Sequence, residues 1–323
     1  MSVATQAALA CVLVVGLAGC GGGATTSKGS NGLTKIDVGI MPITSVAALK
    51  LGIKKGFFKK EGLDVKTHVA QSGAALIPAV ANGQYQFAFS NNISLMIAYG
   101  KGMPLRIVRT ANSAGSDPSK SQEGLAVAKD SPIKSLKQLE GKTIAVNGLN
   151  NTPHLADLIT LERAGVDPKS VKFVEVGYPD MPLALEEGRV DAADLAEPFL
   201  ETAVKQGANV LTDPYRQVKQ DLHLSSWFTT QQFIGSDNEV VRKFAAAVDK
   251  SNAYARANTD EIREYVPTYL DVEPATAKKM GLPNFPQGTE TPAMLKKLAG
   301  KSMEFEFMKK PPKNVAGLLA DVK

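Results

Sequence analysis

Short runs rich in β-branched residues alternate with helix-favouring stretches from residue 36 onwards. This alternation predicts a mostly parallel sheet covered by helices, because each helix carries the chain back to the start of the next strand. The first series predicts strands at 36–41, 63–69, 86–90 and 104–111, and helices at 45–55, 74–82 and 92–99.

A stretch rich in Ser, Gly, Asp and Pro at 112–122 interrupts this rhythm, which then restarts. The second series predicts strands at 124–129, 143–147, 171–176, 190–195 and 209–211, and helices at 153–164, 181–187 and 198–206. Gly83 and Gly188 stand at matching places in the two series, where helices often end in a glycine with positive φ. The sequence therefore predicts two α/β units in series.

The remainder of the chain combines one long β-rich run with helices. The run at 222–233 precedes an amphipathic helix at 238–257 and shorter helical segments separated by prolines. These helices must bury apolar faces, so we expect a second crossing between the units and a return to the first. The predicted fold is α/β, with two Rossmann-like lobes joined by two crossing segments around a cleft. Its expected divisions are lobe 1 at 33–122, lobe 2 at 123–221, and a crossing strand with helical return at 222–323.

The N-terminus carries an apolar run, Ala7 to Ala18. At about twelve residues it is shorter than the roughly 20 needed to cross a bilayer, and its length is typical of a signal peptide, here 1–19. No Lys or Arg precedes it, although signal peptides usually begin with basic residues. Leu-Ala-Gly-Cys, ending at Cys20, resembles the lipobox of bacterial lipoproteins, which implies lipidation of Cys20. The Gly/Ser/Thr-rich residues 20–32 are typical of a flexible tether. We expect an extracytoplasmic protein anchored to the cell membrane.

Composition excludes several kinds of chemistry. The chain of 323 residues has two cysteines, Cys11 and Cys20, so thiolate metal sites, disulfide frameworks and cysteine nucleophiles are excluded beyond Gly21. Its three histidines are scattered, and the net charge of +5 is spread without a basic run suited to nucleic acid. Common motifs for nucleotide binding, zinc proteases and serine hydrolases are missing. We expect no catalytic residue, cofactor, metal ion or nucleic-acid partner.

Small, uncharged polar residues dominate the loops that follow the predicted strands. Ligands of parallel α/β sheets bind at the carboxyl ends of the strands, where these loops gather. Each such residue could simply cap a helix. Together they would direct backbone N–H groups and positive helix ends at one cleft, which suits an oxyanion. The resulting candidate ligand contacts are Thr44, Ser72, Gly73, Ser90, Asn91, Asn151 and Thr152.

Three larger side chains are also candidates, each with an alternative. Tyr178 lies in a loop after a predicted strand and could stack on a ligand. Glu197 precedes Pro198 and could meet a ligand ammonium, or could begin a helix as an acid favoured by the macrodipole. Trp227, the only tryptophan, could form a pocket wall or belong to the core.

The run Lys55 to Val65, KGFFKKEGLDV, resembles a signature of periplasmic solute-binding proteins for nitrate, alkanesulfonates, taurine and thiamine-pyrimidine precursors. Further matches lie at 139–146, 161–168, and 190–193 leading to 197–199. The resemblance implies a type II periplasmic-binding, Venus-flytrap fold that closes over one small molecule. It also implies delivery of that molecule to an ABC permease and its ATPase, with ligand contacts in the loops named above.

We therefore expect the monomeric solute-binding component of an ABC importer, not an enzyme. Its ligand would be a small organic anion or zwitterion of the sulfonate, taurine, nitrate or pyrimidine-precursor type. An aminosulfonate would fit better than nitrate if Glu197 faces the cleft. Two alternatives stay open. One is an enzyme on the same fold, similar to thiamine-pyrimidine synthases, whose cysteine-rich motif this chain lacks. The other is a ligand-sensing receptor protein.

Overall fold

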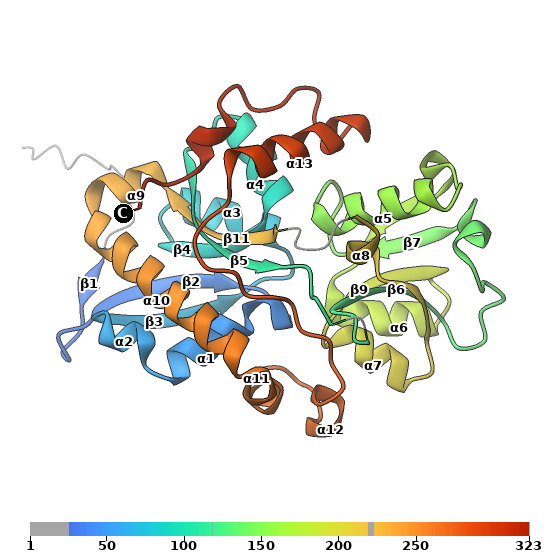
Figure 1. Ribbon diagram of the computed structural model, residues 1–323, viewed down its shortest axis with the longest axis horizontal. Helices are drawn as coiled ribbons and strands as arrows, with labels where there is room; N and C mark the ends of the chain where they lie inside the picture. Colours follow the sequence, from blue (N-terminus) through green and yellow to red (C-terminus); the bar gives the residue numbers. More distant parts are fainter. Residues whose placement is uncertain (1–25, 118, 219–222, 323) are drawn as a thin grey trace, which may run out of the picture.

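Two sheets form the centres of two α/β lobes, which lie side by side in Figure 1. The computed structural model describes residues 26–117, 119–218 and 223–322. The predicted signal peptide and Cys20 lie outside these residues. The end of the expected tether does have regular structure, because Ser27 and Lys28 pair with the first long strand across a turn containing Gly32, whose φ is +77°.

The sheet of lobe 1 combines parallel and antiparallel strands. In it β2 pairs in parallel with β3 and β4, while β11 lies between β4 and β5 and runs antiparallel to both. The strands of this sheet are β1 (Ser27–Lys28), β2 (Thr34–Ile40), β3 (Leu63–Val69), β4 (Phe87–Asn91), β5 (Leu105–Ser113) and β11 (His223–Thr230).

Helices cover both faces of this sheet (Figure 1). Because successive residues of β11 point to opposite faces, Trp227 packs with the helices on one side and Phe228 with those on the other. On the first side Phe244 stacks on Phe87 with ring centroids 3.8 Å apart. The first group is α1 (Ala47–Lys54), α2 (Phe57–Lys60) and α10 (Asn238–Ala257), and the second is α3 (Gly73–Ala81) and α4 (Asn92–Gly100).

Lobe 2 has a five-stranded sheet in the order β10-β6-β9-β7-β8. Here β7 is parallel to β8 and β9, and β6 is antiparallel to β9 and β10. Its strands are β6 (Glu123–Val127), β7 (Thr143–Val146), β8 (Lys172–Glu175), β9 (Ala192–Ala196) and β10 (Asn209–Thr212). Its helices are α5 (Thr152–Arg163), α6 (Met181–Glu186), α7 (Phe199–Lys205) and α8 (Pro214–Val218), with 3-10 turns at η2 (Leu136–Leu139), η3 (Pro168–Ser170) and η4 (Tyr178–Asp180).

The predicted fold class is confirmed, with two corrections of detail. The sheets are mixed, because β11 returns from lobe 2 and enters the first sheet against the direction of its neighbours, and β6 runs antiparallel to both of its neighbours in the second. The β-rich run at 222–233 divides into β11 and a helix, α9 (Gln231–Ser236), because the Thr230 hydroxyl accepts the Phe233 N–H at 3.1 Å and so caps a helix start.

The C-terminal part packs on lobe 1 and also touches lobe 2 (Figure 1). Glu273 forms a 2.5 Å ion pair with Lys205 of lobe 2. Leu295 and Leu298 share an apolar cluster with Leu155 of α5. No helix among residues 26–117, 119–218 and 223–322 is long and apolar enough to cross a membrane. The elements here are α11 (Thr259–Tyr265), η5 (Val266–Thr268), α12 (Pro274–Ala277), α13 (Pro292–Glu304) and η6 (Val315–Leu318).

Substituting Gly281 tests the contact between the C-terminal part and the first crossing. A Cβ on Gly281 would lie 2.2 Å from the carbonyl oxygen of Ser121, a backbone atom. We expect Gly281→Ala to lower the free energy of unfolding by about 1–3 kcal/mol in denaturant titrations. Gly300→Ala is the control, because nothing lies within 4 Å of its Cβ and alanine favours the α13 helix. Equal effects of the two changes would contradict this packing.

Candidate functional site

A small pocket lies between the lobes, at the carboxyl ends of β2, β4 and β7. Both lobes and both crossings supply its walls, which are Met41, Ile43, Ser45, Phe89 and Asn91 from lobe 1, Asn112, Leu224 and Ser225 from the crossing strands, and Glu123, Asn147, Asn151, Pro153, Tyr178 and Tyr215 from lobe 2. Its cavity volume is about 30 Å³, room for one or two water molecules, so the lobes lie close together around it.

Two helices begin at this pocket. Asn91 caps α4, its Oδ1 accepting the Ser94 N–H at 2.9 Å. Asn151 caps α5 in the same way, its Oδ1 accepting the His154 N–H at 3.0 Å. The positive ends of both helices are therefore directed at the pocket, as the loop composition suggested.

Glu123 and Tyr178 form one polar wall. The Tyr178 hydroxyl donates to Glu123 Oε1 at 2.9 Å, and both side chains are buried. Burial, then the neighbouring Asp194, raises the pKa of Glu123 well above its usual range. Tyr178 stacks on Phe199 with a centroid distance of 6.2 Å, which holds its ring in place.

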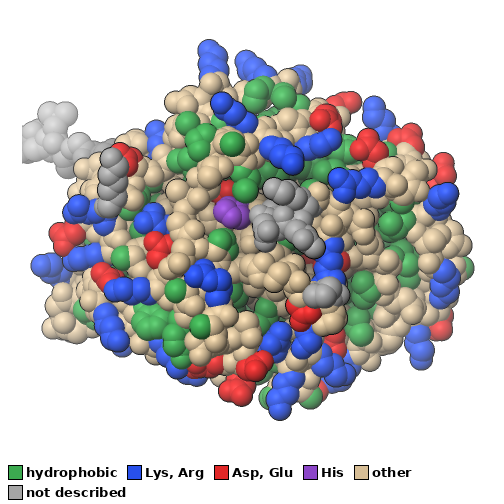
Figure 2. Space-filling view, viewed as in Figure 1, with side chains coloured by type: hydrophobic (Ala, Val, Ile, Leu, Met, Phe, Trp, Pro, Cys, Tyr) green, Lys and Arg blue, Asp and Glu red, His purple; other side chains and the backbone are tan. Residues whose placement is uncertain are grey.

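The pocket wall carries no Lys, Arg or His among the described residues. Basic side chains lie on the outer surface, where Figure 2 shows them interspersed with Asp and Glu. No group of three His, Cys, Asp or Glu in the described part of the chain could hold a metal ion. Recognition at this pocket therefore relies on helix ends, amides, hydroxyls and one carboxyl group.

Thr152, one of the predicted contacts, bridges the lobes beside the pocket instead of forming its wall. Its Oγ1 lies 3.4 Å from Asn91 Oδ1 and 3.5 Å from the carbonyl oxygen of Leu224. Thr44 also joins the lobes, because its N–H donates to the carbonyl of Glu197 at 3.0 Å.

Ser72, Gly73 and Ser90 shape the loop behind the pocket and are not part of its wall. Ser72 caps α3, accepting the Ala75 N–H at 3.3 Å. A Cβ on Gly73 would lie 2.8 Å from Ser90 Cα, so glycine allows α3 to approach β4 closely. Ser90 is fully buried, and its hydroxyl has no hydrogen-bond partner among the described residues.

Glu197 directly follows β9 and does not reach the pocket wall. Its Oε2 accepts the Glu201 N–H at 3.1 Å at the start of α7, and its Oε1 accepts the Gly281 N–H at 3.3 Å. This arrangement matches the helix-start alternative. Burial raises the pKa of Glu197 to about 8.

Trp227 also lies away from the pocket, in the core of lobe 1. Its ring meets Phe89 edge-on at 5.6 Å and Phe244 at 6.2 Å. Since Phe89 lines the pocket, Trp227 supports the wall from behind.

Sequence reasoning missed six of the polar wall residues, which are Ser45, Asn112, Glu123, Asn147, Tyr215 and Ser225. Asn112 lies where a boundary loop was expected, and the structure extends β5 through it. Glu123 is the first residue of β6 and directly precedes the strand predicted at 124–129, so an acid at a buried strand start was its only signal. Tyr215 comes from the short helix α8, and only the tertiary fold places it here.

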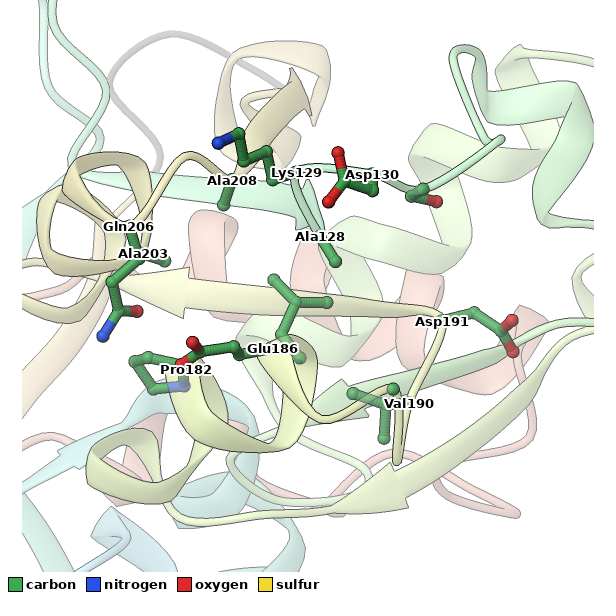
Figure 3. A pocket seen from close by; sticks show the side chains of 13 residues that line it. Ala128, Lys129, Asp130, Pro182, Glu186, Val190, Asp191, Ala203, Gln206 and Ala208 are labelled. Atoms are coloured by element: carbon green, nitrogen blue, oxygen red, sulfur yellow. The ribbon is translucent and has the colours of Figure 1, made fainter.

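Figure 3 shows a larger pocket, with a cavity volume of about 400 Å³. It lies within lobe 2 alone, with Lys129, Asp130, Glu186 and Asp191 spread around it. A ligand there would touch lobe 2 only, whereas the pocket between Asn91 and Asn151 has walls from both lobes and both crossings, so that pocket is the candidate site.

Two lobes, two crossing segments and a pocket shared by all of them define a protein of the periplasmic-binding type. The chain belongs to the NMT1/THI5-like family, whose model matches residues 43–262. It is 31% identical over 207 residues to the taurine-binding periplasmic protein of Escherichia coli, a match covering 63% of this chain and 61% of that relative.

Two solved structures share the fold. The ligand-binding component of an ABC-type import system from Staphylococcus aureus superposes with a TM-score of 0.77 at 15% identity, covering 90% of this chain and 99% of that chain. The alkanesulfonate-binding protein SsuA from Xanthomonas axonopodis pv. citri, bound to MOPS, superposes with a TM-score of 0.71 at 15% identity. This match covers 88% of this chain and 98% of that chain.

The buried carboxyl of Glu197 predicts a pH dependence of stability. Its pKa is about 8 in the fold against 4.5 for the free group, so the folded state holds the extra proton and stability falls as pH rises through this window. The free energy of unfolding of wild type should fall between pH 5.5 and pH 8.5. In Glu197→Gln we expect this fall to be smaller, by on the order of 2 kcal/mol. Denaturant titrations at both pH values measure this.

The exposed Glu264→Gln is the control and should show the wild-type pH dependence. An equal fall in unfolding free energy between the two pH values for wild type and Glu197→Gln would show that this carboxyl does not hold its proton in the folded state.

Proposed function

We propose that this protein is the solute-binding component of an ABC importer, and that its ligand is a small organic anion or zwitterion. The observation that carries the proposal is the pocket wall drawn from both lobes and both crossings. A ligand there contacts both lobes only in the closed arrangement, so binding shifts the population towards closure. Residues 33–122 with 222–323 would move as one body and 123–221 as the other.

The starts of α4 and α5 provide the anion-binding part of the proposal. Both helices point their positive ends at the pocket from opposite lobes, and helix N-termini bind anionic groups without help from Lys or Arg. The similarity to a taurine-binding protein is consistent with such a group. The proposed partners are an ABC permease and its ATPase, the protein acts as a monomer, and no bond of the solute is made or broken.

Binding can be measured directly with a thermal-shift screen of taurine, ethanesulfonate, nitrate and a hydroxymethylpyrimidine. We expect at least one class to raise the melting temperature by several degrees, because a ligand that binds only the folded state stabilises it. Asn151→Ser keeps a capping oxygen for α5 but removes an amide from the pocket wall. It should weaken binding about tenfold, as expected for one or two lost hydrogen bonds.

Asn314→Ser is the matched control, since Asn314 caps η6 by accepting the Gly317 N–H and lies outside the pocket. Its affinity should equal that of wild type. Absence of binding across a wide solute panel, or equal effects of the two substitutions, would contradict the proposed site.

We also propose that Cys20 carries a lipid anchor on the extracytoplasmic side of the cell membrane. The Leu-Ala-Gly-Cys run and the apolar segment before it support this. Cys20→Ala should move the protein from the membrane fraction to the soluble fraction, as judged by immunoblotting. Cys11→Ala, in the leader, should leave it with the membrane. Retention of Cys20→Ala at the membrane would exclude the anchor.

A further inference from the structure

Three buried carboxyl groups gather on the lobe 2 side of the pocket. Glu123 on β6, Asp194 on β9 and Asp157 on α5 are 5%, 1% and 0% exposed. Leu125 stands opposite Asp194 in the antiparallel register, so Glu123 and Asp194 are diagonal neighbours on one face of the sheet. Asp157 lies one turn beyond Pro153, a pocket residue, on the helix that covers this face.

These carboxyl groups have no cationic partner in the described part of the chain. The oxygens of Asp157 accept no hydrogen bond from the described residues, and the carboxyl of Asp194 interacts with that of Glu123. Glu123 accepts a hydrogen bond from Tyr178. An ionised acid buried without a cation is costly, so the three carboxyl groups hold protons unless a positive counterpart binds beside them.

The remaining groups around the acids do not supply that counterpart. Tyr215 from α8 is neutral and buried, and its pKa is raised well above the usual range by burial and then by Glu123. Asp213 adds a further acid, which Arg216 pairs at 3.2 Å between Nε and Oδ2. The nearby guanidinium is thus bound to another carboxylate.

A second, independent observation comes from the first crossing. Asn112 is 1% exposed and lines the same pocket as Glu123. Its Nδ2 donates to Ser45 Oγ at 3.1 Å, and its buried Oδ1 has no partner among the described residues. Two segments of the chain therefore present acceptors to one pocket.

We propose that Glu123 and Asn112 bind a protonated amino group of the solute, and that Asp194 and Asp157 behind Glu123 supply the negative charge that this ammonium neutralises. The inference rests on the proposed function and narrows its ligand class. With the starts of α4 and α5 in the same pocket, the preferred solute is a zwitterion bearing an amine, and plain anions bind less tightly.

Proton linkage follows from this arrangement. Burial raises the pKa of Asp194 to about 7, and burial followed by the charge of Asp194 raises that of Asp157 well above its usual range. Before binding, the cluster holds protons near neutral pH. An ammonium favours the ionised carboxylates, so binding releases protons and affinity rises as pH increases from 6 to 8. An alkyl ammonium stays charged over this range, as a lysine side chain does.

Isothermal titration of the full chain with matched pairs of solutes tests the inference. The pairs are taurine with ethanesulfonate and β-alanine with propionate, and nitrate is added as an anion without carbon. We expect an amine-bearing member to bind at least about tenfold more tightly than its amine-free partner, since a hydrogen bond to a charged group is lost. Titrations in phosphate and in Tris should show net proton release on binding.

Glu123→Gln keeps the size of the side chain and removes its charge. It should abolish most of the preference for the amine. Glu186→Gln, exposed on the same lobe and outside the pocket, should keep the wild-type preference. Circular dichroism verifies folding, and the proton release of the wild type tests the inference even where a variant fails to fold.

The outcomes separate the two proposals. The ammonium site is overturned if ethanesulfonate or propionate binds as tightly as its amine-bearing partner, if nitrate binds as tightly as taurine, or if binding releases no proton. The solute-binding function stands in each of these cases. If none of the solutes binds, both proposals fail for these ligand classes.

Discussion

The insertion of β11 between β4 and β5 is the constraint on which the rest of the structure depends. A strand in the middle of a sheet must pair on both edges and bury both faces, and β11 does so with Trp227 on one side and Phe228 on the other. Lobe 1 is therefore complete only after the chain has built lobe 2 and returned. Two crossings follow from this order, and with them a cleft bounded by both lobes.

The same insertion explains why the pocket contains residues of the crossings. Asn112 at the end of β5 and Ser225 at the start of β11 lie in register as neighbours and both line the pocket. A ligand between the lobes thus touches the segments about which the lobes would turn. If the lobes close on a solute as proposed, a substitution in these segments would affect both binding and closure.

Much of the secondary structure could be predicted from local pattern. The strand at 63–69 and the helix at 238–257 have the predicted bounds, because a two-residue alternation and a long amphipathic repeat need no tertiary information. The division of 222–233 into β11 and α9 was missed, since a single capping threonine decides it.

The site was less predictable for the same reason. Asn91 and Asn151 line the pocket and were found through their capping chemistry, which is local. Tyr215 reaches the pocket only because α8 packs against α5, a contact that no sequence pattern shows. The sequence left Glu197 either as a ligand contact or as an acid at a helix start. The N–H groups of Glu201 and Gly281, which its carboxylate accepts, account for its place at the start of α7.

The short β1 strand has a mechanical consequence. Ser27 and Lys28 pair with the start of β2, and the Thr26 hydroxyl donates to Asp237 at 2.8 Å, just before α10. Tension applied to the N-terminus therefore enters lobe 1 through the edge of its sheet and the end of its longest helix, and bypasses the crossings. A chain held at that end would keep lobe 1 still while lobe 2 swings, so opening and closing need not work against the attachment.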